Sequence, residues 1–277
     1  MLHTLTGTLR HWFNLLTYSW KAIGPRRILQ RLLPYSTDAE ARNVDSGFDA
    51  RYGTETNAGV TPDEAGIPPP RVRGATMYLP SMDGDLDAML DALAWSRALL
   101  EQATFVDIGS GKGRAVFLAA MRPFREAVGL ELSPMLHETA ERNLAKMQSS
   151  GALRAPVRLC LGDATAVHVP RGPLIVYLYH PFREPVAAKV VDRIVASIAA
   201  SPRPAAILYG HPTLQRCLDP DVFARGGMFR YAHQGVRTTR RFQIGWSVWT
   251  NEAWLDDARS YARTEDVMPR LVMRSSH

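Results

Sequence analysis

An apolar segment that turns through three closely spaced glycines most constrains what this chain can fold into. The segment FVDIGSGKGRAVFLAA spans residues 105–120 and contains Gly109, Gly111 and Gly113. It predicts a buried strand, a tight turn that brings bare backbone against a ligand, and then a helix. Asp107 lies at the end of the predicted strand, so its carboxylate belongs to the same candidate site.

The spacing of these glycines argues against two common phosphate sites. A dinucleotide fingerprint needs a third glycine where this chain has Arg114. A Walker loop needs Ser or Thr after its lysine, whereas Lys112 is followed by Gly113. The turn therefore favours a ligand that presents no phosphate here.

Two further segments place acids where an adenosine would need them. The segment EAVGLELSP, residues 126–134, predicts a strand ending in Glu131, whose carboxylate can accept from both hydroxyls of a ribose. The segment PVRLCLGDAT, residues 156–165, places Asp163 just past a strand, where it can accept from an adenine amino group. Both acids follow strands, and ligands of open α/β sheets bind outside the carboxyl ends of strands.

A fourth strand is predicted within GPLIVYLYHPF, residues 172–182, which ends in Tyr179, His180, Pro181 and Phe182. Its continuous apolar run is typical of a strand that is buried on both faces. Its last residues should therefore border the same site.

Together these features resemble the class I S-adenosylmethionine (SAM) methyltransferases, over about residues 104–212. The resemblance implies an α/β fold with a Rossmann-like seven-stranded mixed sheet, an N-terminal helical extension, and SAM as the cofactor. The cofactor contacts that it implies are Asp107, Gly109, Ser110, Gly111, Gly113, Glu131, Asp163 and Ala164.

A narrower resemblance concerns the methyl acceptor. The motifs DIGSGKGR, Tyr78-Leu79-Pro80-Ser81 and Tyr-x-Pro-Phe are similar to those of the seven-strand protein-lysine methyltransferases, including the non-SET histone enzymes and their bacterial relatives. This implies an amine acceptor such as a protein lysine, with a dry aromatic channel that lowers the pKa of the amine. The acceptor-side catalytic residues would be Tyr78, Tyr179, His180, Pro181 and Phe182.

His180 leaves the acceptor open. In those relatives the residue before Pro181 is usually Asn, so a small molecule methylated on nitrogen or oxygen remains the main alternative to a protein lysine. The backbone carbonyl of His180 would orient the amine, and its imidazole, with a reference pKa of ~6.5, would take a proton.

Single residues bear on three other classes of protein. Arg114 argues against an NAD-dependent oxidoreductase, and a non-catalytic SAM-binding protein would keep Asp107 and Glu131. We expect no metal, because His168, His180 and His211 are not at short ligand spacings.

Composition suits one enzyme-sized domain without disulfides. The chain has 277 residues, 46% of them hydrophobic, and only two cysteines, Cys160 and Cys217, so a reducing compartment such as the cytoplasm is expected. Its formal net charge is +6, but its basic runs lack interleaved aromatic residues, so we do not expect nucleic acid as a partner. No segment has the ~20 uncharged apolar residues of a membrane span.

The chain is expected to divide into three parts. Residues 1–40 form a helical extension, because the apolar residues of 1–23 recur at three- and four-residue spacing and no acid occurs before Asp38. We expect residues 1–33 to pack on the domain or on a second subunit. Alternatively, this segment contacts an anionic membrane surface or is removed as a transit peptide.

The glycine- and proline-rich residues 41–80 form an irregular lid or linker, and residues 81–277 form the SAM-binding domain. Within the domain we expect one helix over 81–100, another over 184–200 and a fifth strand over 204–212. An antiparallel pair over 229–237 and 240–251 completes the sheet.

Overall fold

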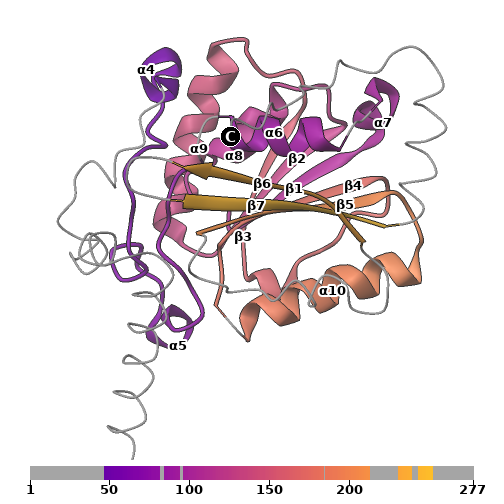
Figure 1. Ribbon diagram of the computed structural model, residues 1–277. Helices are drawn as coiled ribbons and strands as arrows, with labels where there is room; N and C mark the ends of the chain where they lie inside the picture. Colours follow the sequence, from indigo (N-terminus) through magenta and orange to yellow (C-terminus); the bar gives the residue numbers. More distant parts are fainter. Residues whose placement is uncertain are drawn as a thin grey trace, which may run out of the picture. The chain divides into compact units, whose positions relative to one another are not determined.

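A seven-stranded mixed sheet organises the chain in the computed structural model (Figure 1). The structure describes residues 47–81, 84–93, 96–183, 185–212, 230–238 and 243–251. The helical extension predicted for residues 1–40 lies outside these ranges. The described residues after Val44 belong to one compact unit.

The strand order β3-β2-β1-β4-β5-β7-β6 confirms the predicted Rossmann-like methyltransferase fold. The first five strands pair in parallel, and β7 pairs antiparallel with both β5 and β6. The strands are β1 (Thr104–Ile108), β2 (Glu126–Glu131), β3 (Val157–Leu161), β4 (Leu174–Tyr179), β5 (Ala205–Pro212), β6 (Arg230–Thr238) and β7 (Gln243–Thr250).

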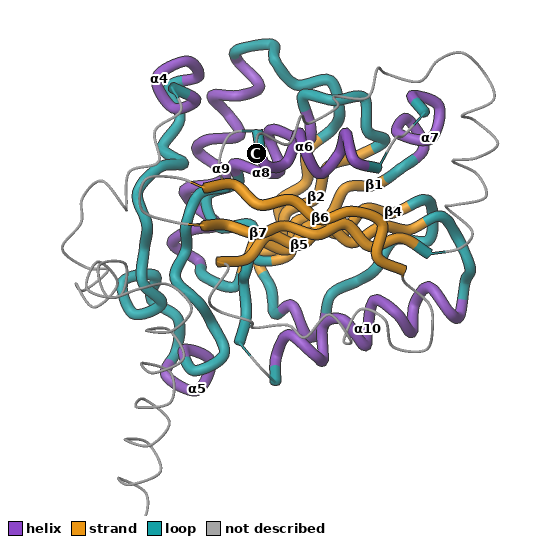
Figure 2. Tube along the Cα trace, in the orientation of Figure 1, coloured by secondary structure: helices purple, strands orange, loops and turns teal. Residues whose placement is uncertain are grey.

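Helices cover both faces of the sheet, as Figure 2 shows with α6 and α8 on one side and α10 on the other. The helices are α4 (Phe48–Tyr52), α5 (Pro69–Val72), α6 (Asp85–Ala92), α7 (Arg97–Gln102), α8 (Arg114–Ala120), α9 (Pro134–Ser149), α10 (Val186–Ala200) and the 3-10 turn Ala164–Ala166. Among the described residues, no helix is both long enough and apolar enough to cross a membrane.

The alternation of side chains along β1 and β4 builds two cores. Phe105 and Tyr177 face α6 and α8, and their rings stack. Val106 and Val176 face α10 on the opposite side of the sheet. Because both faces are covered, these strands are apolar at almost every position, which explains the runs in the sequence.

One predicted helix is wrong in extent. The structure has α6 and α7 where the sequence suggests a single helix over 81–100. Ser96 begins a new helix, since its backbone is extended and its side chain accepts from the amide of Leu99. As a result Leu99 is buried, whereas Leu100 is only partly buried against the core.

Candidate functional site

The glycine turn joins β1 to α8 in left-handed backbone conformations. The φ angles of Gly109, Gly111 and Gly113 are 85°, 54° and 90°, values that favour glycine. The amides of Gly109 and Ser110 donate to the carbonyl of Leu130 at 2.8 and 3.1 Å, which fastens the turn to β2.

Two residues from distant segments lie directly on this turn. A Cβ atom at Gly109 would come within 2.5 Å of Cβ of Pro181, and one at Gly111 within 2.1 Å of the ring of Tyr78. Bare backbone is therefore needed for packing inside the protein.

Glu131, at the end of β2, supports the turn from the other side. Its Oε2 accepts from the amide of Gly111 at 2.8 Å, and its Oε1 accepts from the amides of Leu132 and Ser133 at 2.9 and 2.8 Å. Burial raises the pKa of Glu131, although these three backbone hydrogen bonds oppose the shift. A carboxylate has about four lone-pair sites, so one remains for a ligand hydroxyl.

Asp107 lies deeper in the same cavity and is only 3% exposed. None of the described residues donates a hydrogen bond to its carboxylate. Burial raises the pKa of Asp107 well above its ordinary value, and the nearby charge of Glu131 adds to the shift. A positively charged or hydrogen-donating ligand would offset the cost of ionising this group.

Asp163 follows β3 and caps the 3-10 turn. Its Oδ1 accepts from the backbone amide and the hydroxyl of Thr165 at 2.9 and 2.8 Å, and Arg71 lies 3.6 Å from its Oδ2. The hydrogen bonds from Thr165 lower the pKa of Asp163, and the charge of Arg71 lowers it further. Asp163 therefore stays ionised beside the cavity.

Residues 47–81, here called the strap, form one wall of the cavity. Hydrogen bonds tie the strap to its surroundings: Nζ of Lys112 in the glycine turn donates to Asn57 O at 2.9 Å, and the amide of Glu55 donates to Oδ1 of Asn143 in α9 at 2.8 Å. Within the strap, the hydroxyl of Tyr78 donates to Thr56 O at 2.6 Å. Nζ of Lys112 also lies 5.7 Å from the centre of the Tyr78 ring.

The turn after β4 meets the far end of the strap. His180 adopts a left-handed conformation with φ of 47°, which is uncommon for a residue with a side chain. Its carbonyl accepts from the hydroxyl of Thr76 at 2.5 Å, and the amide of Arg183 donates to Gly74 O at 3.0 Å. Ala75 and Phe182 form an antiparallel bridge beside these bonds.

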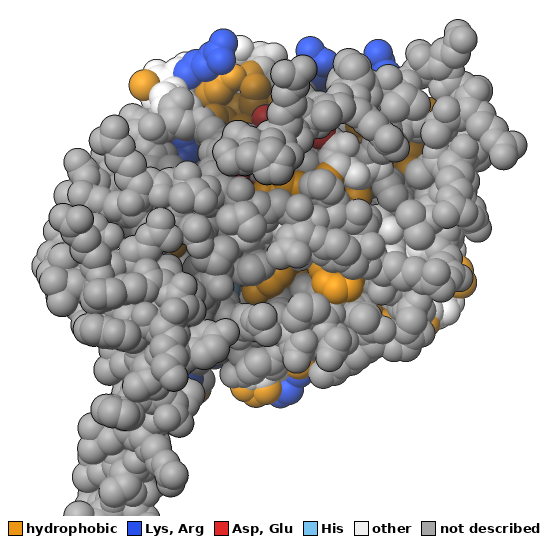
Figure 3. All heavy atoms as spheres, in the orientation of Figure 1, with side chains coloured by type: hydrophobic (Ala, Val, Ile, Leu, Met, Phe, Trp, Pro, Cys, Tyr) orange, Lys and Arg blue, Asp and Glu red, His pale blue; other side chains and the backbone are white. Residues whose placement is uncertain are grey.

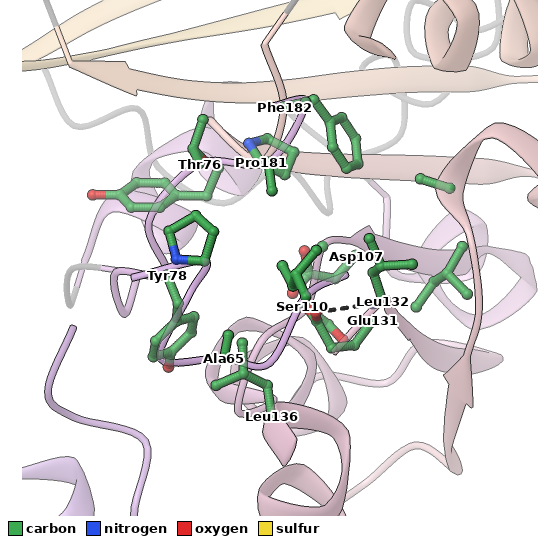
Figure 4. A pocket seen from close by; sticks show the side chains of 18 of the residues that line it. Ala65, Thr76, Tyr78, Asp107, Ser110, Glu131, Leu132, Leu136, Pro181 and Phe182 are labelled. Atoms are coloured by element: carbon green, nitrogen blue, oxygen red, sulfur yellow. Dashed lines mark hydrogen bonds between the residues drawn. The ribbon is translucent and has the colours of Figure 1, made fainter. Parts of the chain in front are cut away.

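These elements enclose a cavity of about 210 Å³ (Figure 4). Most of the predicted site residues share its wall: Tyr78, Asp107, Gly109, Ser110, Glu131, Asp163, Ala164, Tyr179, Pro181 and Phe182. The structure does not bring His180, Gly111 or Gly113 into this wall. Gly111 lies beneath the Tyr78 ring, and a Cβ atom at Gly113 would meet the ring of Phe117.

The sequence does not point to several residues that line the cavity. Thr76, Ser81, Arg114 and Tyr177 line the cavity, as do Val60, Pro62, Ala65, Ile67, Pro70 and Arg71 of the strap. Tyr177 belongs to a predicted strand, so alternation from Tyr179 would have found it. The strap residues carry no periodic signal.

Charge and metal-ligand patterns add little to the site. Within the described ranges, no group of three or more His, Cys, Asp or Glu side chains is arranged to hold a metal ion. On the face seen in Figure 3, the described Lys and Arg side chains are scattered and form no single patch.

The fold and the cavity together define an α/β protein with a candidate ligand site at the carboxyl ends of β1, β2 and β4. No protein-family model matches the sequence, and no curated protein matches it.

Comparison with solved structures finds methyltransferases. An RNA methyltransferase from Salinibacter ruber in complex with S-adenosylhomocysteine (SAH) has 19% identity and a TM-score of 0.39, covering 62% of this chain and 94% of its own. A SAM-dependent methyltransferase from Thiobacillus denitrificans with SAH has 18% identity and a TM-score of 0.42, with coverages of 62% and 92%. The magnesium protoporphyrin IX methyltransferase from Synechocystis PCC 6803 with SAH has 14% identity and a TM-score of 0.44, with coverages of 61% and 84%.

Proposed function

We propose that this chain is a SAM-dependent methyltransferase that methylates an amine, with a protein lysine as the first acceptor to test. One observation carries the proposal: a single cavity joins a bare glycine turn and the carboxylate of Glu131 to a wall of aromatic side chains. The first part suits an adenosine, and the second suits an apolar stem that ends in a reactive atom.

The donor groups of the cavity fit SAM. The free lone-pair site of Glu131 suits a ribose hydroxyl, and Asp163 lies ionised at the next strand end. Asp107 suits a cationic group, because its buried carboxylate accepts no hydrogen bond from the described residues. When bound, SAM supplies a methyl group that its sulfonium has already activated, so the chain needs no nucleophile of its own.

The aromatic wall on the acceptor side supports an amine that reacts in its neutral form. Tyr78, Tyr179 and Phe182 line it with aromatic carbon, and Pro181 lies against Gly109 of the glycine turn. A lysine amine has a reference pKa of ~10.4 and must lose a proton before it reacts. Desolvation against this wall favours the neutral amine, and holding it in line with the methyl group can lower the barrier by ~7–11 kcal/mol.

The test is methyl transfer from tritium-labelled SAM in a host lysate, followed by separation into protein, nucleic-acid and small-molecule fractions. We expect label in protein, on lysine after hydrolysis, and we expect SAH to bind the purified chain in isothermal titration calorimetry. Replacing Glu131 with Ala should weaken the binding of SAH at least about tenfold, since it removes a charged hydrogen-bond acceptor.

Two outcomes contradict the proposal at different levels. Label confined to small molecules would rule out the lysine acceptor and favour small-molecule N- or O-methylation. SAH binding without labelling of any fraction would indicate a SAM-binding protein that does not catalyse transfer.

A further inference from the structure

Thr76 lies in an extended part of the strap that borders the acceptor side. The antiparallel bridges Val60–Tyr78 and Ala75–Phe182 hold residues 75–78. Successive side chains of an extended segment alternate between its two sides, so Thr76 and Tyr78 share one side. In Figure 4 Thr76 lies beside Pro181 and Phe182, apart from Glu131 and Leu136.

The hydroxyl proton of Thr76 already takes part in a hydrogen bond within the protein. It is donated to the carbonyl of His180 at 2.5 Å, in the turn that also carries Pro181 and Phe182. A hydroxyl has one proton and two acceptor lone pairs. A ligand in the cavity therefore meets Oγ1 of Thr76 only as a hydrogen-bond acceptor.

Two neighbouring tyrosine hydroxyls of the cavity also donate their protons to other protein groups. The hydroxyl of Tyr78 donates to Thr56 O at 2.6 Å, and that of Tyr177 donates to Oγ of Ser81 at 2.9 Å. When Asp107 is ionised, its carboxylate can only accept hydrogen bonds. The hydroxyl protons of Tyr78 and Tyr177 are thus directed to other protein groups, and a hydrogen bond between a ligand and Thr76 takes its proton from the ligand.

The two cations of the wall are engaged at other places. Arg71 lies 3.6 Å from Asp163, at the adenosine side, and the guanidinium of Arg114 lies 5.2 Å from the centre of the Phe48 ring. Neither of these two contacts involves Thr76.

Resting on the proposed function, we propose that Thr76 determines acceptor specificity: its Oγ1 accepts a hydrogen bond from the N–H of the acceptor amine. The bond to His180 fixes the hydroxyl rotor and so selects an N–H group over a carboxylate or an apolar end. Thr76 takes the place at the acceptor nitrogen that the sequence suggested for His180, which lies outside the cavity wall.

The experiment uses two defined probes instead of the unknown acceptor. In both, the sulfur of SAH is replaced by a nitrogen that carries a flexible alkyl arm. In the amine probe the arm is aminobutyl, and in the control probe it is pentyl, which has nearly the same length and shape. The ratio of their dissociation constants, measured by calorimetry, reports recognition of the amine alone.

We expect the wild-type chain to prefer the amine probe, and Thr76→Val to lower that preference at least about tenfold. Thr76→Ser keeps the hydroxyl and should retain the preference. Thr139→Val is the matched control, because the Thr139 hydroxyl also donates to a carbonyl, that of Met135 at 2.9 Å, but does not line the cavity.

Each contrary outcome has its own meaning. An unchanged preference in Thr76→Val, or no preference in the wild type, overturns the role of Thr76 while SAH binding preserves the proposed function. Weakened SAH binding in Thr76→Val would make Thr76 a structural residue and also overturn the inference. Failure of the wild type to bind SAH overturns the proposed function and this inference with it.

Discussion

Asp107 carries an electrostatic cost that a cationic ligand would relieve. Its pKa is raised well above the ordinary value, chiefly by burial and then by Glu131, so the free protein holds the proton more tightly than the unfolded chain does. Stability from this group is therefore full below the unfolded pKa and is lost as pH rises through the folded pKa. A cation bound beside Asp107 reverses the preference and releases the proton.

We predict that the affinity for SAM rises with pH until Asp107 is ionised in the free protein, and that binding releases protons below that point. Asp107→Asn should weaken the binding of SAM about tenfold and abolish the pH dependence of its affinity. Both are measured by calorimetry across pH and in buffers of different ionisation enthalpy. Asp163→Asn is the control, because the pKa of Asp163 is lowered and its charge does not change in that range. A dependence that survives Asp107→Asn would assign the proton elsewhere.

Gly111 offers a second test at the scale of one residue. Gly111 and Gly151 both have left-handed backbone conformations, with φ of 54° and 69°. Replacing either with Ala should therefore lower the free energy of unfolding by about 1–2 kcal/mol. Only at Gly111 does the new Cβ meet a neighbour, the Tyr78 ring at 2.1 Å, since nothing lies within 4 Å at Gly151. We predict that Gly111→Ala weakens SAH more than about tenfold, whereas Gly151→Ala leaves SAH binding unchanged.

Urea unfolding and calorimetry measure the two effects of the Gly111 substitution separately. Adding Tyr78→Ala to Gly111→Ala should recover part of the lost stability, because it removes the ring that the methyl group displaces. Equal SAH affinities for the Gly111 and Gly151 variants would show that the Tyr78 ring can move without consequence for the cavity.

At the scale of elements, Asp49 shapes the start of the strap. Its carboxylate accepts from the hydroxyls of Thr54 and Thr56, both at 2.7 Å, and from the amides of Thr56 and Asn57 at 2.9 and 2.7 Å. Burial raises the pKa of Asp49, but these hydrogen bonds outweigh it and the net shift is downward from 3.8. The contribution of Asp49 is therefore present above the unfolded pKa and is lost as pH falls through the folded one.

We predict that Asp49→Ala speeds hydrogen exchange at the amides of Thr56 and Asn57 at least about tenfold at neutral pH. Acidification through the folded pKa should produce the same opening in the wild type. Glu64→Ala, which removes a cap on Thr61 elsewhere in the strap, should leave these amides protected. Equal exchange in Asp49→Ala and wild type would mean that other contacts hold the strap.

At the scale of the whole molecule, β7 completes the larger core. Trp246 of β7 is buried among Leu86, Met89 and Leu93 of the α6 region. Trp246→Ala should lower the free energy of unfolding by about 3–5 kcal/mol, measured with denaturant. Leu161→Ala, at a side chain that is 52% exposed, should change it by less than about 0.5 kcal/mol. A loss below about 1 kcal/mol for Trp246→Ala would show that β7 adds little to the core.

The sheet was predictable from the sequence because the apolar residues of each strand show that it is buried. β1 and β4 are apolar on both faces, the glycine turn follows β1 at once, Glu131 ends β2, and Asp163 lies just past β3. The strap was not predictable in the same way, since its position depends on contacts far apart in sequence. The bond from Thr76 to His180 spans 104 residues, and no local pattern encodes it.

The position of β7 between β5 and β6 bears on how the chain is made. A chain emerging from the ribosome has β1, β2 and β4, which carry the candidate adenosine site and the turn with Pro181, well before the strand that fills the gap beside β5. Until then the edge of β5 and the apolar side of α6 lack their cover, and such surfaces favour aggregation or chaperone binding. The nascent protein can thus form β1, β2 and β4 before Trp246 of β7 is available to cover the core.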